Sequence, residues 1–295
     1  MSMQRRSLLK NIVLSGTAVV AAPALSLAAC NTTSTSYKLK GTINHSVCWW
    51  TYNYMPLVEL CKKVKEIGFA AIDLVGPKDW KVLKENGVFS SMCNGAEISL
   101  TEGWNNKQYH STLIKNYTDH INYVADAGYK NLICFSGNRK GMDDETGLKN
   151  CTEGLKQIAS LAEKRGVVLQ MELFNSKVNH PDYMCDKSAW GIELCKRIGS
   201  PNFKLLYDIY HMQINEGDVI RTINDHHQYF GHYHTAGVPG RHEINETQEL
   251  YYPAIMKAIA ATGYKGYVAQ EFIPTGKTSE DKLAALRDAV SRCDV

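Results

Sequence analysis

The sequence has no CxxC pair of cysteines, and it has no excess charge once its first 29 residues are set aside. The eight cysteines that follow Cys30 therefore argue against a zinc ribbon or a thioredoxin-like site. Residues 1–29 hold three basic side chains and no acidic one, which leaves 30 basic and 30 acidic residues in the remainder. A neutral chain offers no bulk electrostatic reason to bind nucleic acid or an anionic membrane surface.

The first thirty residues have the composition of an export signal. A basic start that contains the pair Arg5-Arg6 precedes an apolar run of small residues over 12–29, which is too weakly flanked for a lasting membrane span. The paired arginines resemble a twin-arginine signal, and the Leu-Ala-Ala-Cys run that ends at Cys30 resembles a bacterial lipobox. We expect a cleaved signal peptide over 1–29 and an exported protein of the periplasm or cell envelope, lipid-anchored at Cys30. The alternative is an ordinary signal peptide with a chance cysteine.

One domain is predicted after the signal. A Thr/Ser-rich stretch within 30–40 indicates a flexible tether, and residues 41–295 contain no further linker or low-complexity segment. The 266 residues that follow position 29 suit a single barrel domain, which typically has about 250 residues.

Short apolar runs alternate with amphipathic stretches along this domain, and many of the stretches end in glycine, which suits the left-handed residue that stops a helix. Eight strand–helix repeats are the count of a closed (β/α)₈ TIM barrel. A doubly wound open sheet is the alternative, but no G-x-G-x-x-G follows the first strand. The predicted strands are 42–49, 70–75, 88–93, 131–136, 167–173, 203–209, 229–235 and 267–273, and the predicted helices are 56–68, 79–86, 109–128, 145–166, 187–199, 218–226, 252–263 and 279–292.

Each of the last four predicted strands carries an acid or a histidine within an apolar run. Active sites of such barrels lie at the carboxyl ends of the strands, so we expect four side chains to converge there. They are Glu172, Asp208, His234 and Glu271. Charged groups are costly to bury unless they are paired or bound to metal, and three carboxylates with one imidazole suit one Mn²⁺, Mg²⁺, Co²⁺ or Zn²⁺ ion. Isolated salt bridges inside the barrel are the alternative. His232 has the parity of His234 but lies one layer deeper, as a core histidine.

Four motifs in the second half of the chain carry a family resemblance. They are MELFN at 171–175, YDIYHMQ at 207–213, HYH leading to VPGRHE at 232–243, and GYKGYV at 263–268 leading to Glu271. Together they resemble the hydroxypyruvate isomerase family, within the larger group of xylose-isomerase-like TIM barrels of sugar isomerases and epimerases. The resemblance implies that Glu172, Asp208 and Glu271 bind metal and that the two glutamates also act as the acid/base pair.

Two positions depart from the family pattern. His234 stands where hydroxypyruvate isomerases commonly carry glutamine and ketose epimerases carry histidine. The epimerases also have a substrate-binding glutamate soon after the first metal ligand, whereas residues 176–178 here read Ser-Lys-Val. These departures leave the metal site intact and leave the substrate open between a sugar and a hydroxy-keto acid.

The implied reaction is proton abstraction next to a carbonyl through an enediolate, assisted by one divalent metal ion. Glu172 and Glu271 would move the proton, and the sequence does not order them. His211 would donate to a substrate oxygen, and the planar fork of Arg241 would clamp a carboxylate or a hydroxyl pair. Further predicted substrate-binding residues are Asn175, His242 and His45, and Trp49 and Trp50 would either line the pocket or belong to the core.

Other functions remain open from the residues alone. A lyase that acts on 3-keto-glycosides needs the same metal-assisted proton abstraction, and an exported enzyme meets glycosides more readily than hydroxypyruvate. An endonuclease-IV-like phosphodiesterase would need many more histidine ligands and a basic surface. A non-catalytic sugar-binding lipoprotein would not need two inward glutamates. An oligomer is compatible with each of these functions.

Overall fold

The computed structural model describes residues 38–295, so the predicted signal peptide and Cys30 lie outside the described residues. Residues 38–295 belong to one compact unit. Among the described residues, no helix has the length and apolar character that a membrane span requires.

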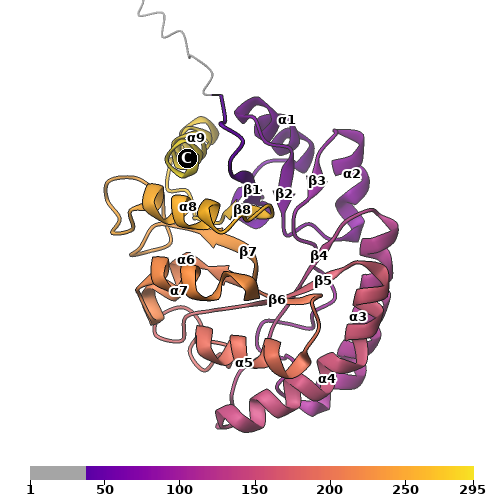
Figure 1. Cartoon of the computed structure of the whole chain (residues 1–295). Coiled ribbons are helices and arrows are strands. Elements are labelled where there is room, and N and C mark those ends of the chain that lie inside the picture. The colour runs from indigo at the N-terminus through magenta and orange to yellow at the C-terminus, as the bar shows by residue number, and fades with distance from the viewer. Residues whose placement is uncertain (1–37) are drawn as a thin grey trace, which may run out of the picture. The chain divides into compact units, whose positions relative to one another are not determined.

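Eight parallel strands form the centre of this unit (Figure 1). Their hydrogen-bonded order is β3-β2-β1-β8-β7-β6-β5-β4. A parallel bridge between Cys93, just after β3, and Leu132 in β4 joins the two ends of that series, so the predicted TIM-barrel fold is confirmed. The strands are β1 (Asn44–Cys48), β2 (Ala71–Asp73), β3 (Phe89–Ser90), β4 (Asn131–Cys134), β5 (Val168–Glu172), β6 (Phe203–Asp208), β7 (Phe230–Thr235) and β8 (Tyr267–Gln270).

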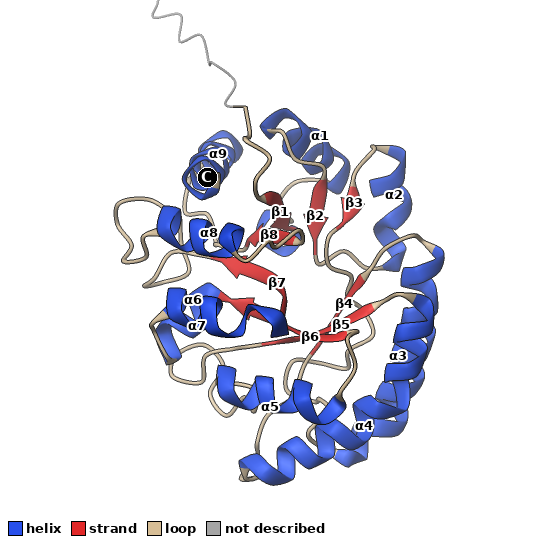
Figure 2. Ribbon diagram, in the orientation of Figure 1, coloured by secondary structure: helices blue, strands red, loops and turns tan. Residues whose placement is uncertain are grey.

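Helices surround the strands and cover their outer side (Figure 2). They bury one continuous apolar core between themselves and the barrel. The α-helices are α1 (Leu57–Ile67), α2 (Trp80–Glu85), α3 (His110–Asp126), α4 (Asp144–Arg165), α5 (Ser188–Ile198), α6 (Ile209–Asn215), α7 (Val219–His226), α8 (Tyr252–Ala261) and α9 (Ser279–Cys293). Short 3₁₀ turns are η1 (Trp49–Tyr52), η2 (Pro77–Asp79), η3 (Lys107–Tyr109) and η4 (His227–Tyr229).

Local sequence signals explain where several helices begin and end. The Asp143 side chain accepts a hydrogen bond from the Thr146 N–H at the start of α4, and Thr278 forms a reciprocal capping box with Asp281 at the start of α9. Such caps satisfy N–H groups that have no partner within the helix. Helix α4 stops at Gly166, which has a φ of 68°, as the glycine pattern predicts.

The prediction fails where a strand runs directly into a helix. Strand β6 ends at Asp208, and α6 begins at Ile209 although no helix was predicted there. The Asp208 side chain starts this helix. Its Oδ1 accepts a hydrogen bond of 3.0 Å from the His211 N–H and so caps the amino end of α6. A residue of the predicted site therefore also starts a helix.

A close backbone contact fixes the long loop between β3 and α3. A Cβ atom on Gly103 would lie 2.4 Å from the backbone of Phe135, Ser136 and Gly137, so only glycine fits there. This approach holds the loop against the carboxyl end of β4, which is the end of the barrel where the predicted site lies.

The ends of the described chain meet at the opposite end of the barrel. The Lys40 N–H donates to Asp294 Oδ2 at 2.7 Å, and Lys40 Nζ donates to the Asp294 carbonyl at 3.0 Å.

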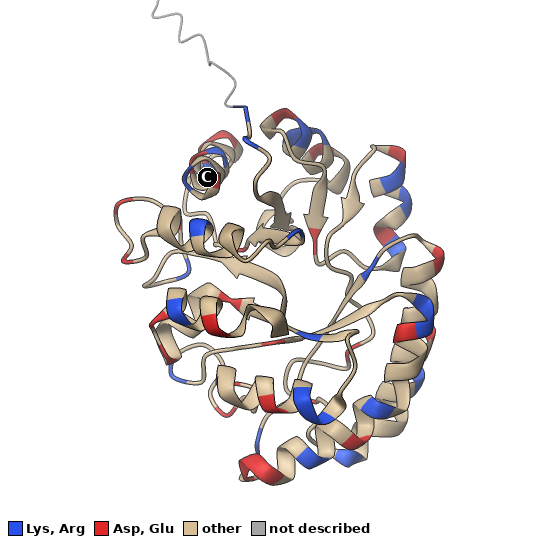
Figure 3. Ribbon diagram, in the orientation of Figure 1, with Lys and Arg blue, Asp and Glu red and all other residues tan. Residues whose placement is uncertain are grey.

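Basic and acidic residues are interspersed over the outer helices (Figure 3), in keeping with the balanced charge of the sequence.

Candidate metal centre and active site

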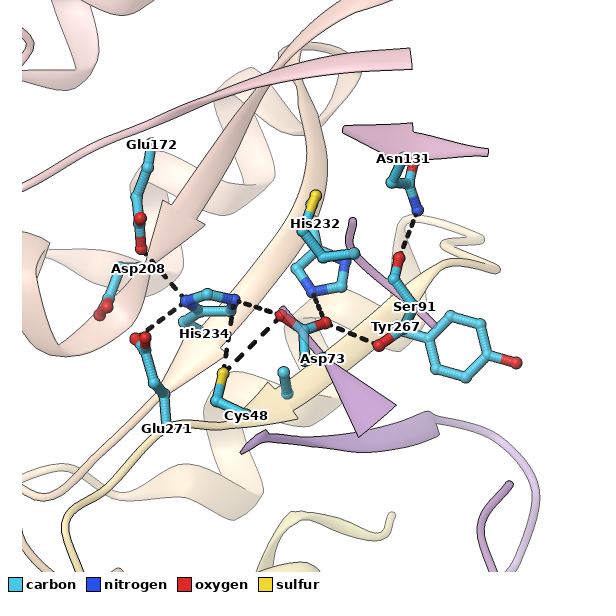
Figure 4. Close-up of polar contacts among 12 residues, drawn as sticks. Cys48, Asp73, Ser91, Asn131, Glu172, Asp208, His232, His234, Tyr267 and Glu271 are labelled. Carbon is cyan, nitrogen blue, oxygen red and sulfur yellow. Dashed lines mark hydrogen bonds and ion pairs between the residues drawn. The ribbon is translucent and has the colours of Figure 1, made fainter. Parts of the chain in front are cut away.

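The four predicted side chains lie together at the carboxyl ends of neighbouring strands (Figure 4). Glu172 and Asp208 end β5 and β6, His234 lies near the end of β7, and Glu271 directly follows β8. Each offers one ligand atom, and these atoms lie within 4.8 Å of one another. All four residues are at most 3% exposed. We call Glu172, Asp208, His234 and Glu271 the central cluster.

His234 and Arg241 supply the positive partners of the central cluster. His234 Nδ1 lies 2.9 Å from Glu271 Oε2 and 3.1 Å from Glu172 Oε1. Arg241 Nη2 lies 2.5 Å from Glu271 Oε2 and 3.8 Å from Asp208 Oδ2. Arg241 and a protonated His234 thus face three carboxylates in a buried site.

The pKa values of the cluster reflect the excess of carboxylates over positive groups. Burial raises the pKa of Asp208 to about 8 and that of Glu172 to about 7, with the charge of Glu271 adding to both increases. Burial also acts on Glu271, but Arg241 and His234 outweigh it and hold the pKa of this carboxyl well below its usual range. Burial opposes the charged form of His234, but the charge of Glu271 and the contacts with Cys48 and Asp73 together outweigh it and raise the pKa of the imidazole.

The residues of the central cluster fit a divalent cation. Nδ1 of His234 can donate one hydrogen bond, which goes to Glu271, so the buried Glu172 Oε1 has an ionic contact but no hydrogen-bond partner among the described residues. Three carboxylates and an imidazole are oxygen and nitrogen donors of the kind that bind Mn²⁺, Mg²⁺, Co²⁺ or Zn²⁺. A cation among them would relieve both the orphaned oxygen and the repulsion. That the cluster binds metal stays a prediction.

A second buried layer lies directly beneath the central cluster. Asp73 Oδ1 is 3.1 Å from His234 Nε2, and Asp73 Oδ2 is 2.9 Å from His232 Nε2. The Ser91 hydroxyl donates to Asp73 Oδ2 at 2.6 Å, and the Cys48 thiol lies 3.7 Å from Oδ1. His232 is buried and lies nearer the amino end of β7 than His234, in the deeper layer that was predicted.

His211 projects a free ring nitrogen toward the cluster. Asn175 Nδ2 lies 2.7 Å from His211 Nδ1, so Nδ1 accepts and we assign the proton to Nε2. Nε2 has no hydrogen-bond partner among the described residues and lies 3.6 Å from Asp208 Oδ2. Asn175 Oδ1 is itself held by the backbone N–H groups of Val178 and Asn179. Asn175 therefore orients His211 instead of lining the cavity.

A cavity of about 330 Å³ opens above the central cluster, within the range of small-molecule sites. The side chain of Trp50 closes one edge, where its Nε1–H donates to Glu271 Oε1 at 2.8 Å and its ring lies 5.1 Å from the Arg241 guanidinium carbon. The cavity is lined by Trp50, Leu74, Asn94, Glu97, Leu100, Ile133, Phe135, Glu172, Phe174, His180, Arg241 and Glu271.

Of the five predicted substrate-binding residues, only Arg241 is among the residues that line the cavity, and two of the others lie away from the site. His45 stands near the amino end of β1, where Nε2 is 3.7 Å from Asp294 Oδ1, so it belongs to the opposite end of the barrel. His242 is exposed, and its Nδ1 contacts the Ile273 carbonyl at 3.1 Å. That contact ties the loop after β7 to the segment after β8. Neither position supports a contact with substrate.

Sequence reasoning missed three residues of the site. Asp73 follows the pattern used for the late strands, an acid inside an apolar run, but the pattern was not applied to the second strand. His180 stacks on Phe174 with ring centroids 4.1 Å apart and faces the cavity. Glu97 comes from the loop after β3. His180 and Glu97 lie in loops, where no periodicity indicates the direction of a side chain.

Comparisons with known proteins agree with this geometry. A family model described as "Xylose isomerase-like TIM barrel" matches residues 61–289. The putative hydroxypyruvate isomerase of Homo sapiens is 32% identical over 128 residues, which cover 43% of this chain and 46% of that protein. The 2-oxo-tetronate isomerase of Pectobacterium atrosepticum is 24% identical over 237 residues, which cover 77% and 90%. The chain thus spans less than half of the human relative and most of the bacterial one.

Solved structures show the same fold. The AP endonuclease, family 2, of Brucella melitensis has a TM-score of 0.73 at 25% identity, and the match covers 83% of this chain and 97% of that one. The D-psicose 3-epimerase of Clostridium cellulolyticum H10, solved with D-tagatose, has a TM-score of 0.70 at 17% identity, with 85% and 98% covered. At this identity the epimerase structure supports the fold alone.

Proposed function

The chain belongs to the xylose isomerase-like TIM barrel family, and on that premise we propose that it is a divalent-metal-dependent isomerase or epimerase of a hydroxy-carbonyl substrate. One observation carries the proposal. Glu172 and Glu271 both belong to the central cluster and both line the cavity, whereas Asp208 and His234 are not among its lining residues. Two carboxylates therefore reach the space where a substrate would lie.

This arrangement suits proton transfer at carbon. A divalent cation held by Glu172, Asp208, His234 and Glu271 would polarise the substrate carbonyl and lower the energy of the enolised form. Glu172 and Glu271 remove the proton from the carbon next to the carbonyl and return it to the neighbouring carbon or the opposite face. The Nε2–H of His211 donates to a substrate oxygen, and the ring of Trp50 limits the access of water to Glu271.

The charges of the site favour an uncharged sugar over a 2-oxo acid. Arg241 is the one lysine or arginine among the cavity-lining residues, and it is already bound to Glu271 and close to Asp208. A dication together with Arg241 balances the three carboxylates of the cluster. A substrate carboxylate would then be buried beside Glu97 and Glu172 without a cation of its own, which is costly.

A lyase of 3-keto-glycosides is the second candidate. It would use the same proton abstraction and then expel the group attached to the sugar. The observation in its favour is the apolar part of the cavity wall, which could hold an aglycone. The wall consists of Leu74, Leu100, Ile133, Phe135 and Phe174.

The test is deuterium exchange by Mn²⁺-loaded protein in D₂O. The panel contains neutral ketoses, 3-keto-glycosides and hydroxypyruvate, and NMR detects deuterium at the carbon next to the carbonyl. We expect exchange with a neutral sugar at least tenfold faster than with hydroxypyruvate. Glu172→Gln and Glu271→Gln should each lower the exchange by 10²-fold or more, in line with the usual worth of a general acid or base.

A matched control tests whether the loss of exchange is specific to Glu172 and Glu271 or follows the loss of any carboxylate. Glu85→Gln changes an exposed glutamate at the end of α2 and should leave the exchange rate unchanged. Release of an aglycone that accompanies exchange would select the lyase. Absence of exchange with every panel member in the wild-type protein would refute the proposal.

A further inference from the structure

Asp73 is a buried carboxylate that the proposed chemistry does not use. It is 0% exposed, and its two oxygens contact His234, His232 and Ser91. Among the described residues, neither a lysine nor an arginine forms an ion pair with Asp73, so two imidazoles and a hydroxyl replace the usual cationic partner. An apolar residue in such a position commonly leaves a protein equally or more stable. The cost of burying this acid therefore points to a role beyond packing.

We propose that Asp73 is a positioning residue that holds His234 with Nε2–H toward the barrel floor and the Nδ1 lone pair toward the central cluster. The inference rests on the proposed function, because it assigns His234 as a metal ligand. An imidazole that binds a cation through one nitrogen carries its proton on the other, and an acceptor at that second nitrogen selects the tautomer and the ring orientation. Asp73 Oδ1 lies 3.1 Å from Nε2 and is that acceptor.

The geometry also explains why Asp73 itself does not move. Ser91 donates to Oδ2 at 2.6 Å, and His232 Nε2 lies 2.9 Å from the same oxygen as an ionic contact without a hydrogen bond. The hydrogen bond from Ser91 anchors Oδ2, and Oδ1 lies opposite His234 (Figure 4). The ring of His234 is also 0% exposed, so water does not compete for Nε2.

A different assignment is a second cation held by Asp73, His232 and His234, whose ligand atoms also lie within 4.8 Å of one another. That site would need the lone pair of His234 Nε2 and is incompatible with a proton there. The two assignments predict different numbers of bound ions. Positioning by Asp73 requires one ion per chain.

The experiment measures Mn²⁺ binding to the full-length apoprotein by isothermal titration calorimetry. Asp73→Asn keeps the shape of the side chain but can present its amide N–H₂ to Nε2, and we expect the affinity to fall 10- to 100-fold, the usual effect of losing such a partner. Asp288→Asn makes the same change at an exposed aspartate of α9, so its affinity should stay within about threefold of wild type. Deuterium exchange at saturating Mn²⁺ should recover in Asp73→Asn, because the acid/base pair is intact.

A second measurement keeps the inference testable should Asp73→Asn fail to fold. In wild-type protein loaded with diamagnetic Zn²⁺, ¹⁵N–¹H correlation spectra should show the His234 proton on Nε2. A proton on Nδ1, two bound ions per chain, or wild-type affinity in a folded Asp73→Asn protein would overturn the role of Asp73 alone. Absence of any divalent-ion binding to the wild-type protein would overturn the proposed function together with it.

Discussion

At the scale of single residues, the site depends on which nitrogen of each histidine holds the proton. Asn175 donates to His211 Nδ1, and this contact leaves Nε2–H without a hydrogen-bond partner among the described residues, 3.6 Å from Asp208 Oδ2. Asn175 was predicted to touch substrate, but it is not among the residues that line the cavity, and its side chain contacts His211.

Asn175→Asp should lower the rate of deuterium exchange by about tenfold, which corresponds to the loss of about one hydrogen bond. A carboxylate at this position accepts from Nδ1 and so removes the free Nε2–H. Asn179→Asp is the matched control, because Asn179 Oδ1 acts only as an acceptor, from Asn175 and from Tyr210 Oη. Equal losses in the two variants would show that the position of the proton on His211 is unimportant.

Position at the carboxyl ends of strands located most of the site from the sequence. Glu172, Asp208, His234 and Glu271 were named together because each is an acid or a histidine inside an apolar run near the end of one of the last four strands. His45 was predicted to bind substrate from its place on the first strand, without regard to its height along that strand. Pairing of Asn44 with Tyr267 puts His45 level with the start of β8, far from the mouth.

At the scale of elements, the strands were easier to predict than the helices that follow them. Continuous apolar runs mark buried parallel strands, and all eight were found. Helix α6 was missed because its start depends on the side chain of Asp208, and this residue had already been placed in the predicted strand 203–209. The loop between β3 and α3 is held by the contact between Gly103 and Gly137, a tertiary feature that no local pattern carries.

The capping box of α9 should contribute to stability without contributing to activity. Thr278→Ala removes the acceptor for the Asp281 N–H, and we expect the free energy of unfolding to fall by about 1 kcal/mol. Urea denaturation followed by circular dichroism measures the change, with Lys257→Ala on exposed α8 surface as the control. A decrease in deuterium exchange in Thr278→Ala would contradict the separation of the two properties.

At the scale of the whole molecule, the barrel separates a reactive end from a structural one. The central cluster and its cavity occupy the carboxyl ends of the strands, while His45, Asp294 and Lys40 join the chain ends at the other side. Basic and acidic residues alternate over the outer helices in the view of Figure 3.

The structural end predicts a pH dependence of stability. Burial lowers the pKa of His45 from 6.5 to about 4, and the Asp294 carboxylate only partly offsets it. The unfolded chain therefore takes up a proton between pH 6.5 and 4 that the folded chain does not. The free energy of unfolding should fall as the pH drops through this window, by up to about 3 kcal/mol from this residue.

His45→Gln removes that titration and should flatten the decline relative to wild type. Urea denaturation at half-unit steps from pH 7.5 to 4 measures the difference between the two proteins, in which the other histidines cancel. Parallel curves for His45→Gln and wild type would show that this imidazole takes up its proton equally in the folded and unfolded states.

The contact between Lys40 and Asp294 means that the order of the strands along the polypeptide can be changed without changing the fold. Strands β1 and β8 are hydrogen-bonded neighbours, so any strand of the barrel can come first in the chain. A short peptide joining position 38 to position 295 would close the backbone, and new ends could be opened at an exposed turn such as 246–247. Such a circular permutant would retain every strand pairing.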